Sequence, residues 1–375
     1  MSVSLRKVGK LESFPFESGG VTAGRRHGRG AQTNRSGRYE PIAYEPQDDG
    51  WESLAELEAL TTEVQEVPAR RILARNDSPD IGFDRSINPY RGCEHGCAYC
   101  YARPTHETLG MNAGIDFESK VLVKHDAVKL LRKELNRKSW QCEPIMISGV
   151  TDCYQPAERE YKLTRGILEV MLEAHQPVCL ITKNALVLRD LDLIAAMAEK
   201  NLIGLALSVT TLDAELARTL EPRTATPQAR LRAIRELSAA GVPVRAMLAP
   251  IIPGLTDNEV PALMTAVKEA GARGVGYTML RLPLAVAPIF QAWLREHRPQ
   301  AAERIESLIR DMRSGKLNDA QFGSRMRGRG AYADGVAQTF DVFAKKLGLN
   351  TPWEELDCSQ FRPPELVRGQ RRLFT

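Results

Sequence analysis

The chain has 375 residues and a formal net charge of +4, so it is only mildly basic. Its composition, with 43% hydrophobic and 26% charged residues, is that of a globular protein and excludes collagen-like and wholly disordered chains. No run approaches the roughly 20 apolar residues of a membrane-spanning helix. The first residues also lack the apolar core of a secretory signal. The sequence therefore predicts a cytoplasmic protein without membrane contact.

The N-terminal part of the chain is polar and basic. Residues 1–50 are rich in Gly, Arg, Ser and Asn and show no sustained apolar period. Such a segment buries too little apolar surface to offset its ordering entropy, so we expect a basic, flexible N-terminal extension. It is either a solvated tail or an arm that touches nucleic acid. Residues 51–80 are expected to form a linker or helical lead-in.

From residue 81 short apolar runs alternate with amphipathic stretches. The runs have the size of strands covered on both faces, and they are residues 145–147, 177–182, 203–209, 244–249 and 275–280, with a first strand expected near 84–90. The stretches between them predict helices at about 124–138, 158–175, 187–200, 227–240 and 257–271. Gly241 sits where a glycine that ends a helix is expected.

Repeated strand–helix units predict a parallel sheet of the α/β class. About six units indicate a partial (β/α)6 TIM-like barrel, which we place at residues 81–300. Residues 301–375 are expected to be a C-terminal helical and then irregular extension. Its basic run at 325–330 is either a phosphate-contacting patch or a solvated surface.

Three of the seven cysteines lie close together, as Cys93, Cys97 and Cys100, and the other four are scattered. An odd number of cysteines in a reducing compartment favours metal binding over a disulfide framework. Three thiolates on one tight loop suit a cube of iron and sulfide and leave its fourth iron open. A zinc site with His95 as the fourth ligand is the alternative.

At these residues the sequence resembles the radical S-adenosylmethionine (SAM) superfamily, whose Cys-x3-Cys-x2-Cys signature has an aromatic residue before the last cysteine, here Tyr99. Within it, the chain looks like the spore photoproduct lyase-like branch, also called DNA repair photolyase-like. The blocks that carry this likeness are residues 148–158, 182–183, 208–211, 220–223 and 249–254.

The resemblance implies a [4Fe–4S] cluster on Cys93, Cys97 and Cys100, with SAM chelating the open iron. Reductive cleavage of SAM would then give a 5′-deoxyadenosyl radical that abstracts hydrogen from a substrate. A small electron donor such as flavodoxin or ferredoxin would supply the electron. The substrate is unknown, and a nucleic acid is one candidate. A non-catalytic, metal-stabilised nucleic-acid-binding protein is the alternative function.

The resemblance also implies contacts to SAM at the ends of the predicted strands. Ser148, Gly149, Thr151 and Asp152 occupy the place of the family's Gly-Gly-Glu stretch, which receives the SAM amino group, with Ser148 in place of the first Gly. The carboxylate would pair with Lys183 or Arg223, Ser208 and Thr210 would bond the ribose or carboxylate, and Ala249 with Pro250 would line the adenine. Surface caps at Lys183 and Ser208, and pairing of Arg223 with Glu221, are the alternatives.

Three residues are candidates for catalysis, because the lyase relatives relay hydrogen atoms through a cysteine and tyrosines. They are Cys153, Tyr99 and Tyr101. Cys153 does not fall at the relatives' cysteine position, so a buried thiol is its alternative, and Tyr99 is expected to shield the cluster and adenine. Asp152 and Glu158 are either a general acid and base or caps of the helix near residue 158.

Overall fold

A computed structural model describes residues 28–33, 37–39 and 61–365. Its centre is a seven-stranded sheet in the order β10-β9-β8-β7-β6-β3-β2. The six parallel strands are β3 (Arg85–Ile87), β6 (Ile145–Ile147), β7 (Val178–Thr182), β8 (Ile203–Ser208), β9 (Val244–Ile251) and β10 (Gly274–Met279). They coincide with the five apolar runs and with the first strand expected near 84–90, so the predicted partial (β/α)6 barrel is confirmed.

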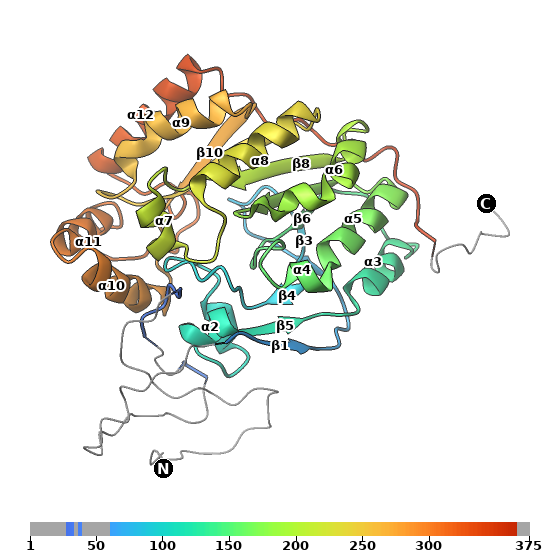
Figure 1. The fold of residues 1–375 in the computed structure, drawn as a ribbon, viewed down its shortest axis with the longest axis horizontal. Coiled ribbons are helices and arrows are strands. Elements are labelled where there is room, and N and C mark those ends of the chain that lie inside the picture. The colour runs from blue at the N-terminus through green and yellow to red at the C-terminus, as the bar shows by residue number, and fades with distance from the viewer. Residues whose placement is uncertain (1–27, 34–36, 40–60, 366–375) are drawn as a thin grey trace, which may run out of the picture.

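Burial on both faces explains why these runs form strands. Every residue of β8 is buried, because barrel side chains cover one face and helices cover the other. Figure 1 shows these helices on the outer side of the sheet. They are α3 (Ala127–Leu135), α4 (Glu158–Tyr161), α5 (Leu163–Ala174), α6 (Leu191–Ala198), α8 (Pro227–Ala239) and α9 (Val260–Glu269), with short 3-10 turns at Ala185–Asp190 and Asp257–Glu259. Helix α7 (Ala214–Leu220) lies at the end of the sheet instead.

Local sequence signals fix the ends of α8. The Thr226 side chain accepts a hydrogen bond from the Ala229 amide (3.3 Å), and Pro227 occupies the first turn. Gly241 follows with φ +80°, the left-handed conformation that ends many helices, as predicted. The predicted helix at 158–175 is instead divided in two, because Lys162 adopts φ +50° between α4 and α5.

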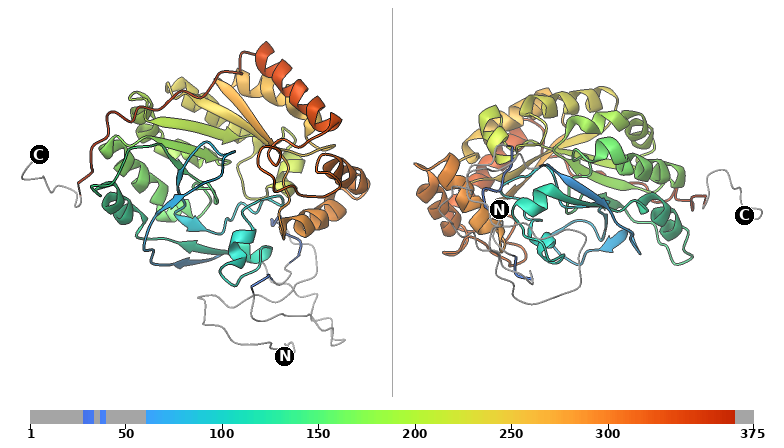
Figure 2. Two further views of the ribbon diagram at one scale, coloured as in Figure 1. Left: turned by 180° about the vertical axis from the view of Figure 1, so that it is seen from behind. Right: turned by 60° about the horizontal axis from the view of Figure 1, so that its bottom comes forward.

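A second, smaller sheet lies beside the barrel and was not predicted (Figures 1 and 2). Its order is β1-β5-β4, with β1 at Glu63–Glu66, β5 at Lys120–Val123 and β4 at Tyr90–Arg91. The short helices α1 (Pro104–Glu107) and α2 (Ile115–Ser119) precede β5. At the barrel edge, β2 (Leu73–Arg75) pairs antiparallel with β3.

Three further helices follow β10. Helices α10 (Val286–His297) and α11 (Ala302–Asp311) pack together around the fully buried Trp293, and α12 (Ala331–Lys346) packs on α9. The chain then runs without regular structure across the barrel, where the Arg362 amide donates to the Ala174 carbonyl (2.9 Å). None of the helices in the described part of the chain has the length and apolarity needed to span a membrane.

Candidate functional site

The three clustered cysteines lie on the loop that follows β4. Gly92 and Gly96 adopt φ +80° and +62°, so the loop turns tightly around them. Cys97 and Tyr99 pack against Leu220, the last residue of α7, and against Ile252 and Leu280, which directly follow strands β9 and β10. The loop therefore covers the carboxyl ends of the barrel strands, the edge at which barrel enzymes build their sites.

All three thiols are free, and two of them, Cys93 and Cys97, are only 6% exposed. Burial and the neighbouring Glu221 raise the pKa of Cys97 well above its usual value, against the opposing effect of Lys183. Such thiols are poorly suited to stand alone as thiolates, and a cationic metal centre would favour their ionised form.

The donor set fits an iron–sulfur cube better than a single ion. Among the described residues, no three His, Cys, Asp or Glu side chains converge closely enough to hold one metal ion. Ligands of one zinc ion all lie within about 2.3 Å of it, whereas each cysteine on a cube binds a different iron. Both ring nitrogens of His95 are also engaged, Nδ1 with Asp152 at 3.4 Å and Nε2 with Asn184 at 3.1 Å, so the zinc alternative with His95 finds no support.

In the loop after β6, a serine adopts a backbone conformation that is usual for glycine. Ser148 adopts φ +80°, where glycine is favoured, and the family resemblance implies a Gly at this position. Its hydroxyl donates to the Thr151 carbonyl (2.7 Å) and accepts from the Cys153 amide (2.7 Å). These two bonds span the loop and offset the strain of the serine backbone.

Asp152 lies at the centre of a polar contact between this loop, β7 and the cysteine loop. Its carboxylate is 3.4 Å from His95 Nδ1 and accepts hydrogen bonds from the Thr182 hydroxyl (2.7 Å) and the Lys183 amide (2.8 Å). Burial is the largest single effect and opposes its ionisation, but His95, the Lys183 amide and the Thr182 hydroxyl together lower the pKa of Asp152 to about 2. Asp152 therefore ties β7 to the cysteine loop as a carboxylate.

A second buried carboxylate, Glu221, gathers the cationic and hydroxyl side chains near the ends of β7 and β8. It pairs with Arg230 (2.5 Å) and with Lys183 (3.7 Å), and it accepts hydrogen bonds from the Thr210 hydroxyl (2.8 Å) and the Tyr99 hydroxyl. Burial is the largest single effect and opposes its ionisation, but Arg230, Lys183 and the Tyr99 hydroxyl together lower the pKa of Glu221 to about 2.

Lys183 is only loosely held in this cluster. Its ammonium donates to the Ala249 carbonyl (3.2 Å) and lies 5.8 Å from the centre of the Tyr99 ring. Since an ammonium has three protons, Lys183 retains capacity to bind an anion. Ala249 precedes Pro250 through a cis peptide bond at the end of β9. The side chains predicted to contact SAM from β7, β8 and β9 are thus neighbours.

Arg223 lies apart from this cluster. Its guanidinium is 3.4 Å from Glu94 and 3.1 Å from the Thr62 hydroxyl, so the alternative in which Arg223 pairs with Glu221 is wrong. Arg230 holds Glu221 instead, because it extends from α8 into the barrel end. Ser208 is buried at the end of β8, where its carbonyl accepts from Arg230 (3.1 Å).

The remaining candidates differ in exposure. Tyr101 is 53% exposed, and its hydroxyl donates to the Gly149 carbonyl (2.6 Å). Cys153 has no exposed surface and packs in the main core. Neither Asp152 nor Glu158 caps α4, contrary to one expectation. Glu158 instead accepts a hydrogen bond from the Thr164 amide at the start of α5 (3.1 Å), because the helix is interrupted at Lys162.

Sequence reasoning missed the buried charges that organise the site. The sequence did not indicate the ion pairs of Arg230 with Glu221 and of His95 with Asp152, because these residues approach each other only in the folded chain. The available signal was position: Glu221 lies within one of the blocks that carry the family resemblance, directly before Pro222.

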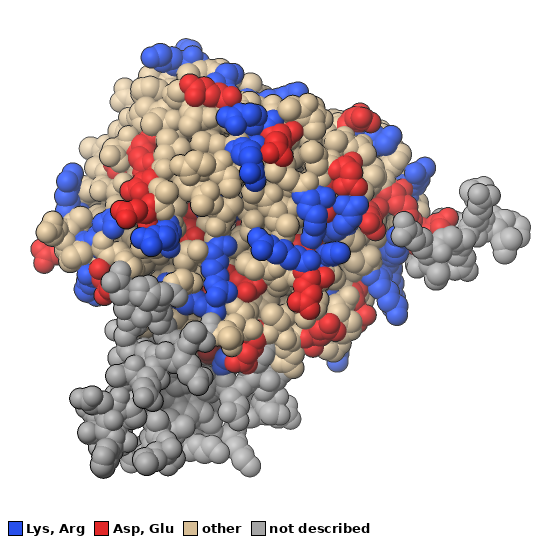
Figure 3. Space-filling view, in the orientation of Figure 1, with Lys and Arg blue, Asp and Glu red and all other residues tan. Residues whose placement is uncertain are grey.

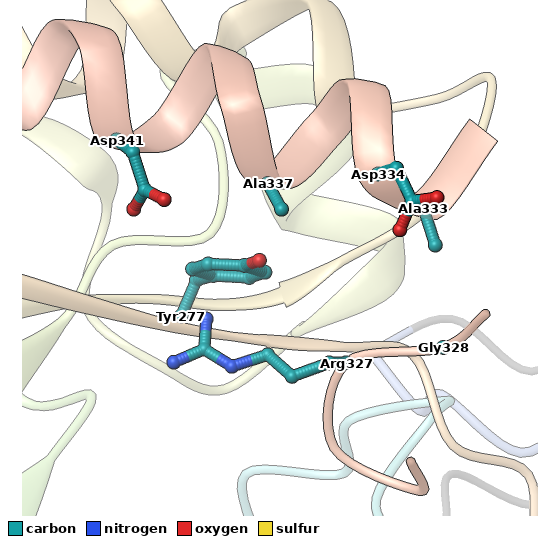
Figure 4. A pocket seen from close by; sticks show the side chains of 7 residues that line it. All are labelled: Tyr277, Arg327, Gly328, Ala333, Asp334, Ala337 and Asp341. Carbon is teal, nitrogen blue, oxygen red and sulfur yellow. The ribbon is translucent and has the colours of Figure 1, made fainter. Parts of the chain in front are cut away.

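A separate cavity of about 280 Å³ lies between β10 and α12, away from the cysteine loop. Figure 4 shows the Tyr277 ring between α12 and the Arg327 guanidinium, which is 3.9 Å from the ring centre. None of the site residues expected from the sequence lines this cavity.

The chain is similar to proteins from bacteria and archaea. Residues 87–267 match the model of the radical SAM superfamily. An uncharacterised protein of Mycobacterium tuberculosis is 40% identical over 232 residues, which are 61% of this chain and 68% of that protein. An uncharacterised protein of Methanocaldococcus jannaschii is 31% identical over 222 residues, which are 59% of this chain and 79% of that protein.

Solved structures share the fold. Spore photoproduct lyase complexed with dinucleoside spore photoproduct matches with a TM-score of 0.56 and 16% identity, over 76% of this chain and 79% of the lyase. A mutant of that lyase with bound AdoMet and dinucleoside spore photoproduct matches with a TM-score of 0.52 and 17% identity, over 76% and 77%. This chain belongs to the radical SAM superfamily and is an enzyme of that type, whose members use a [4Fe–4S] cluster and SAM.

Proposed function

We propose that Cys93, Cys97 and Cys100 hold the [4Fe–4S] cluster and that the enzyme cleaves SAM reductively at it. Bound there, the cluster supplies the electron that splits the sulfonium bond of SAM, and the 5′-deoxyadenosyl radical abstracts hydrogen from the substrate. The observation that carries this proposal is the gathering of three free, largely buried thiols on one loop over the carboxyl ends of the strands.

The chain's own residues would bind and orient SAM around this loop. Lys183 and Thr210 meet at Glu221 and can turn toward the SAM carboxylate, with Ser208 beside them and Arg223 at the rim. The backbone of Ser148, Gly149, Thr151 and Asp152 would receive the amino group, and Ala249 with Pro250 would line the adenine. The loose Lys183–Glu221 pair supports the carboxylate assignment, since an ammonium 3.7 Å from its partner gives up little by turning to a closer anion.

The tyrosines receive different proposed roles. Tyr99 shields the cluster and adenine, because its hydroxyl is fixed on the buried Glu221. Tyr101 reaches the substrate and relays hydrogen, since half of its side chain is exposed next to Gly149. The complete burial of Cys153 favours a structural thiol over a relay role.

We infer that the substrate carries phosphate and is a nucleic acid. Arg281 follows β10 within electrostatic range of Tyr101, and its Nε atom has no hydrogen-bond partner within the described part of the chain. Burial, followed by the neighbouring Arg325, lowers the pKa of Arg281. A phosphate bound at the accessible part of the half-buried Arg281 side chain would offset this loss of solvation, because it supplies a negative charge.

A non-catalytic nucleic-acid-binding protein is less well supported. The arginines of the 325–330 run are engaged: Arg325 pairs with Asp80 (2.5 Å), Arg327 covers Tyr277, and Arg329 donates to Gln321 (2.6 Å). Figure 3 shows Lys and Arg side chains mixed with Asp and Glu on the visible face rather than gathered in one basic patch. This face therefore offers little electrostatic affinity for nucleic acid on its own.

The proposal is tested by measuring 5′-deoxyadenosine. Anaerobically reconstituted protein with SAM and dithionite should release this product, and Cys97→Ala should abolish its release. Cys142→Ala is the matched control, since Cys142 lies outside the loop and contacts Gln176. Product release by Cys97→Ala equal to that of the wild type would refute the ligand assignment.

The substrate class is tested separately by binding in increasing salt. Arg281→Gln should weaken binding to single-stranded oligonucleotides and lower the slope of log affinity against log salt by about one phosphate contact. Arg232→Gln on the exposed face of α8 is the control and should leave the slope unchanged. Binding that does not depend on salt would exclude a nucleic-acid substrate.

We also place the reaction in the cytoplasm, where a reduced flavodoxin or ferredoxin would supply the electron. Replacing dithionite by a reduced flavodoxin or ferredoxin should sustain 5′-deoxyadenosine release. Failure of both proteins with an active cluster would contradict this assignment.

A further inference from the structure

A short N-terminal segment lies against the cysteine loop. Residues 28–33, named here the strap, are far in sequence from the barrel, yet Arg29 is only 4% exposed and Ala31 is fully buried. Ala31 packs in a small apolar cluster with Ile115 of α2 and Ile289 of α10. In Figure 1 the strap is the dark blue segment between these two helices. The strap is therefore part of the folded body.

The strap and the cysteine loop meet backbone against backbone. A Cβ atom on Gly30 would lie 1.7 Å from the carbonyl oxygen of Gly96, between the proposed ligands Cys93 and Cys97. A Cβ atom on Gly96 would in turn lie 2.7 Å from the Glu118 carboxylate. Since real Cβ contacts are essentially never this short, the approach of the two backbones requires glycine at Gly30, whereas at Gly96 the buried Glu118 side chain leaves no room for a Cβ.

The strap also supplies donors to a buried carboxylate. Glu118 has no exposed surface, and its two oxygens accept hydrogen bonds from the amides of Gly30 (3.1 Å) and Ala31 (2.7 Å). The Arg29 side chain donates to the Glu118 carbonyl (2.7 Å). A buried carboxylate needs such donors, because its charge has lost the solvation of water.

Glu118 connects the strap to the cysteine loop through one further residue. It pairs at 2.5 Å with Arg103, which is fully buried. The Arg103 guanidinium in turn donates to the carbonyl of Cys97 (2.8 Å) and to that of Gly96 (3.1 Å). An unbroken path of hydrogen bonds therefore runs from the strap amides to the backbone of a proposed cluster ligand.

We propose that Arg29, Gly30 and Ala31 are positioning residues that fix the cluster-binding loop before any cluster is bound. The strap closes the loop from outside and completes the Glu118–Arg103 pair, so that Gly96 and Cys97 keep one backbone conformation. The inference rests on the proposed ligand role of the three cysteines. It assigns to the N-terminal segment a part in building the catalytic centre.

The test measures how fast the thiols of metal-free protein react with iodoacetamide, by mass spectrometry at each cysteine. Gly30→Ala should raise the alkylation rates of Cys97 and Cys100 by about tenfold or more, since local opening of the loop exposes them. The rate at Cys179, on β7 of the barrel, should stay unchanged and serves as the internal reference. Gly82→Ala is the matched control, because its Cβ would meet open space.

A second variant covers the case in which Gly30→Ala does not fold. Arg29→Ala removes the bond to the Glu118 carbonyl without a clash and should raise the same two rates to a smaller extent. Unchanged rates at Cys97 and Cys100 in either folded variant would overturn the proposed role of the strap. The labelling needs no iron, so a wild-type protein that fails to bind a cluster would refute the proposed function and leave this test valid.

Discussion

The substitution Glu221→Gln tests the buried charge cluster most sharply. Gln has nearly the volume of Glu, so the change removes a charge without opening a cavity. It leaves the guanidinium of Arg230, only 1% exposed, without its counterion at 2.5 Å. Breaking a buried ion pair on one side costs about 3–5 kcal/mol. This loss is a large part of the total stability, which for domains is about 5–15 kcal/mol.

The assay is equilibrium unfolding of the metal-free protein in urea, followed by circular dichroism. Glu221→Gln should lower the unfolding free energy by about 3–5 kcal/mol. The double variant Glu221→Gln/Arg230→Met removes both charges and should be destabilised by less than the sum of the single effects. A loss below about 1 kcal/mol for Glu221→Gln, or strict additivity in the double variant, would refute the reasoning.

Three further predictions concern stability of the metal-free protein. The unfolding free energy of Ser148→Ala should be about 1 kcal/mol lower than that of Ser148→Gly, because only glycine adopts a φ of +80° without strain. Equal stability of the two variants would contradict a strained backbone at Ser148. Trp293→Ala should cost about 3–5 kcal/mol in the same assay, since it empties a buried site and removes the indole bond to the Thr219 carbonyl; a loss below about 1 kcal/mol would contradict its core position. The hydrogen bond and charge of Arg325 lower the pKa of Asp80, so this pair stabilises the fold above about pH 4 and the effect fades as pH falls below it. The stability gap between wild type and Asp80→Asn, measured by thermal unfolding, should therefore shrink on acidification, and a constant gap would contradict the pairing.

The barrel could be predicted because its strands carry their own signal. Runs such as 203–207 carry no polar side chain, which is typical of strands covered on both faces. The small sheet carried no such signal. Its strand β1 reads Glu-Val-Gln-Glu and is largely exposed, and β4 has two residues, so their pairing with β5 depends on the tertiary fold.

Of the candidate site, too, only the part with a local sequence signal could be predicted. The spacing of Cys93, Cys97 and Cys100 is local and was readable, whereas the pairing of Glu221 with Arg230 and of Glu118 with Arg103 arises only when the elements pack. The composition also gave no indication that the strap packs against the folded body, since a Gly- and Arg-rich stretch is typical of a flexible tail. Gly30 is there because two backbones approach, which no single segment reveals.

The central claim, that three cysteines leave one iron open for SAM, is tested most directly by Mössbauer spectroscopy of protein reconstituted with 57Fe. Adding SAM should change the signal of one iron in about four and leave the others unaltered. If the signals of all four irons of an intact cluster stayed unchanged on addition of SAM, the result would contradict the account.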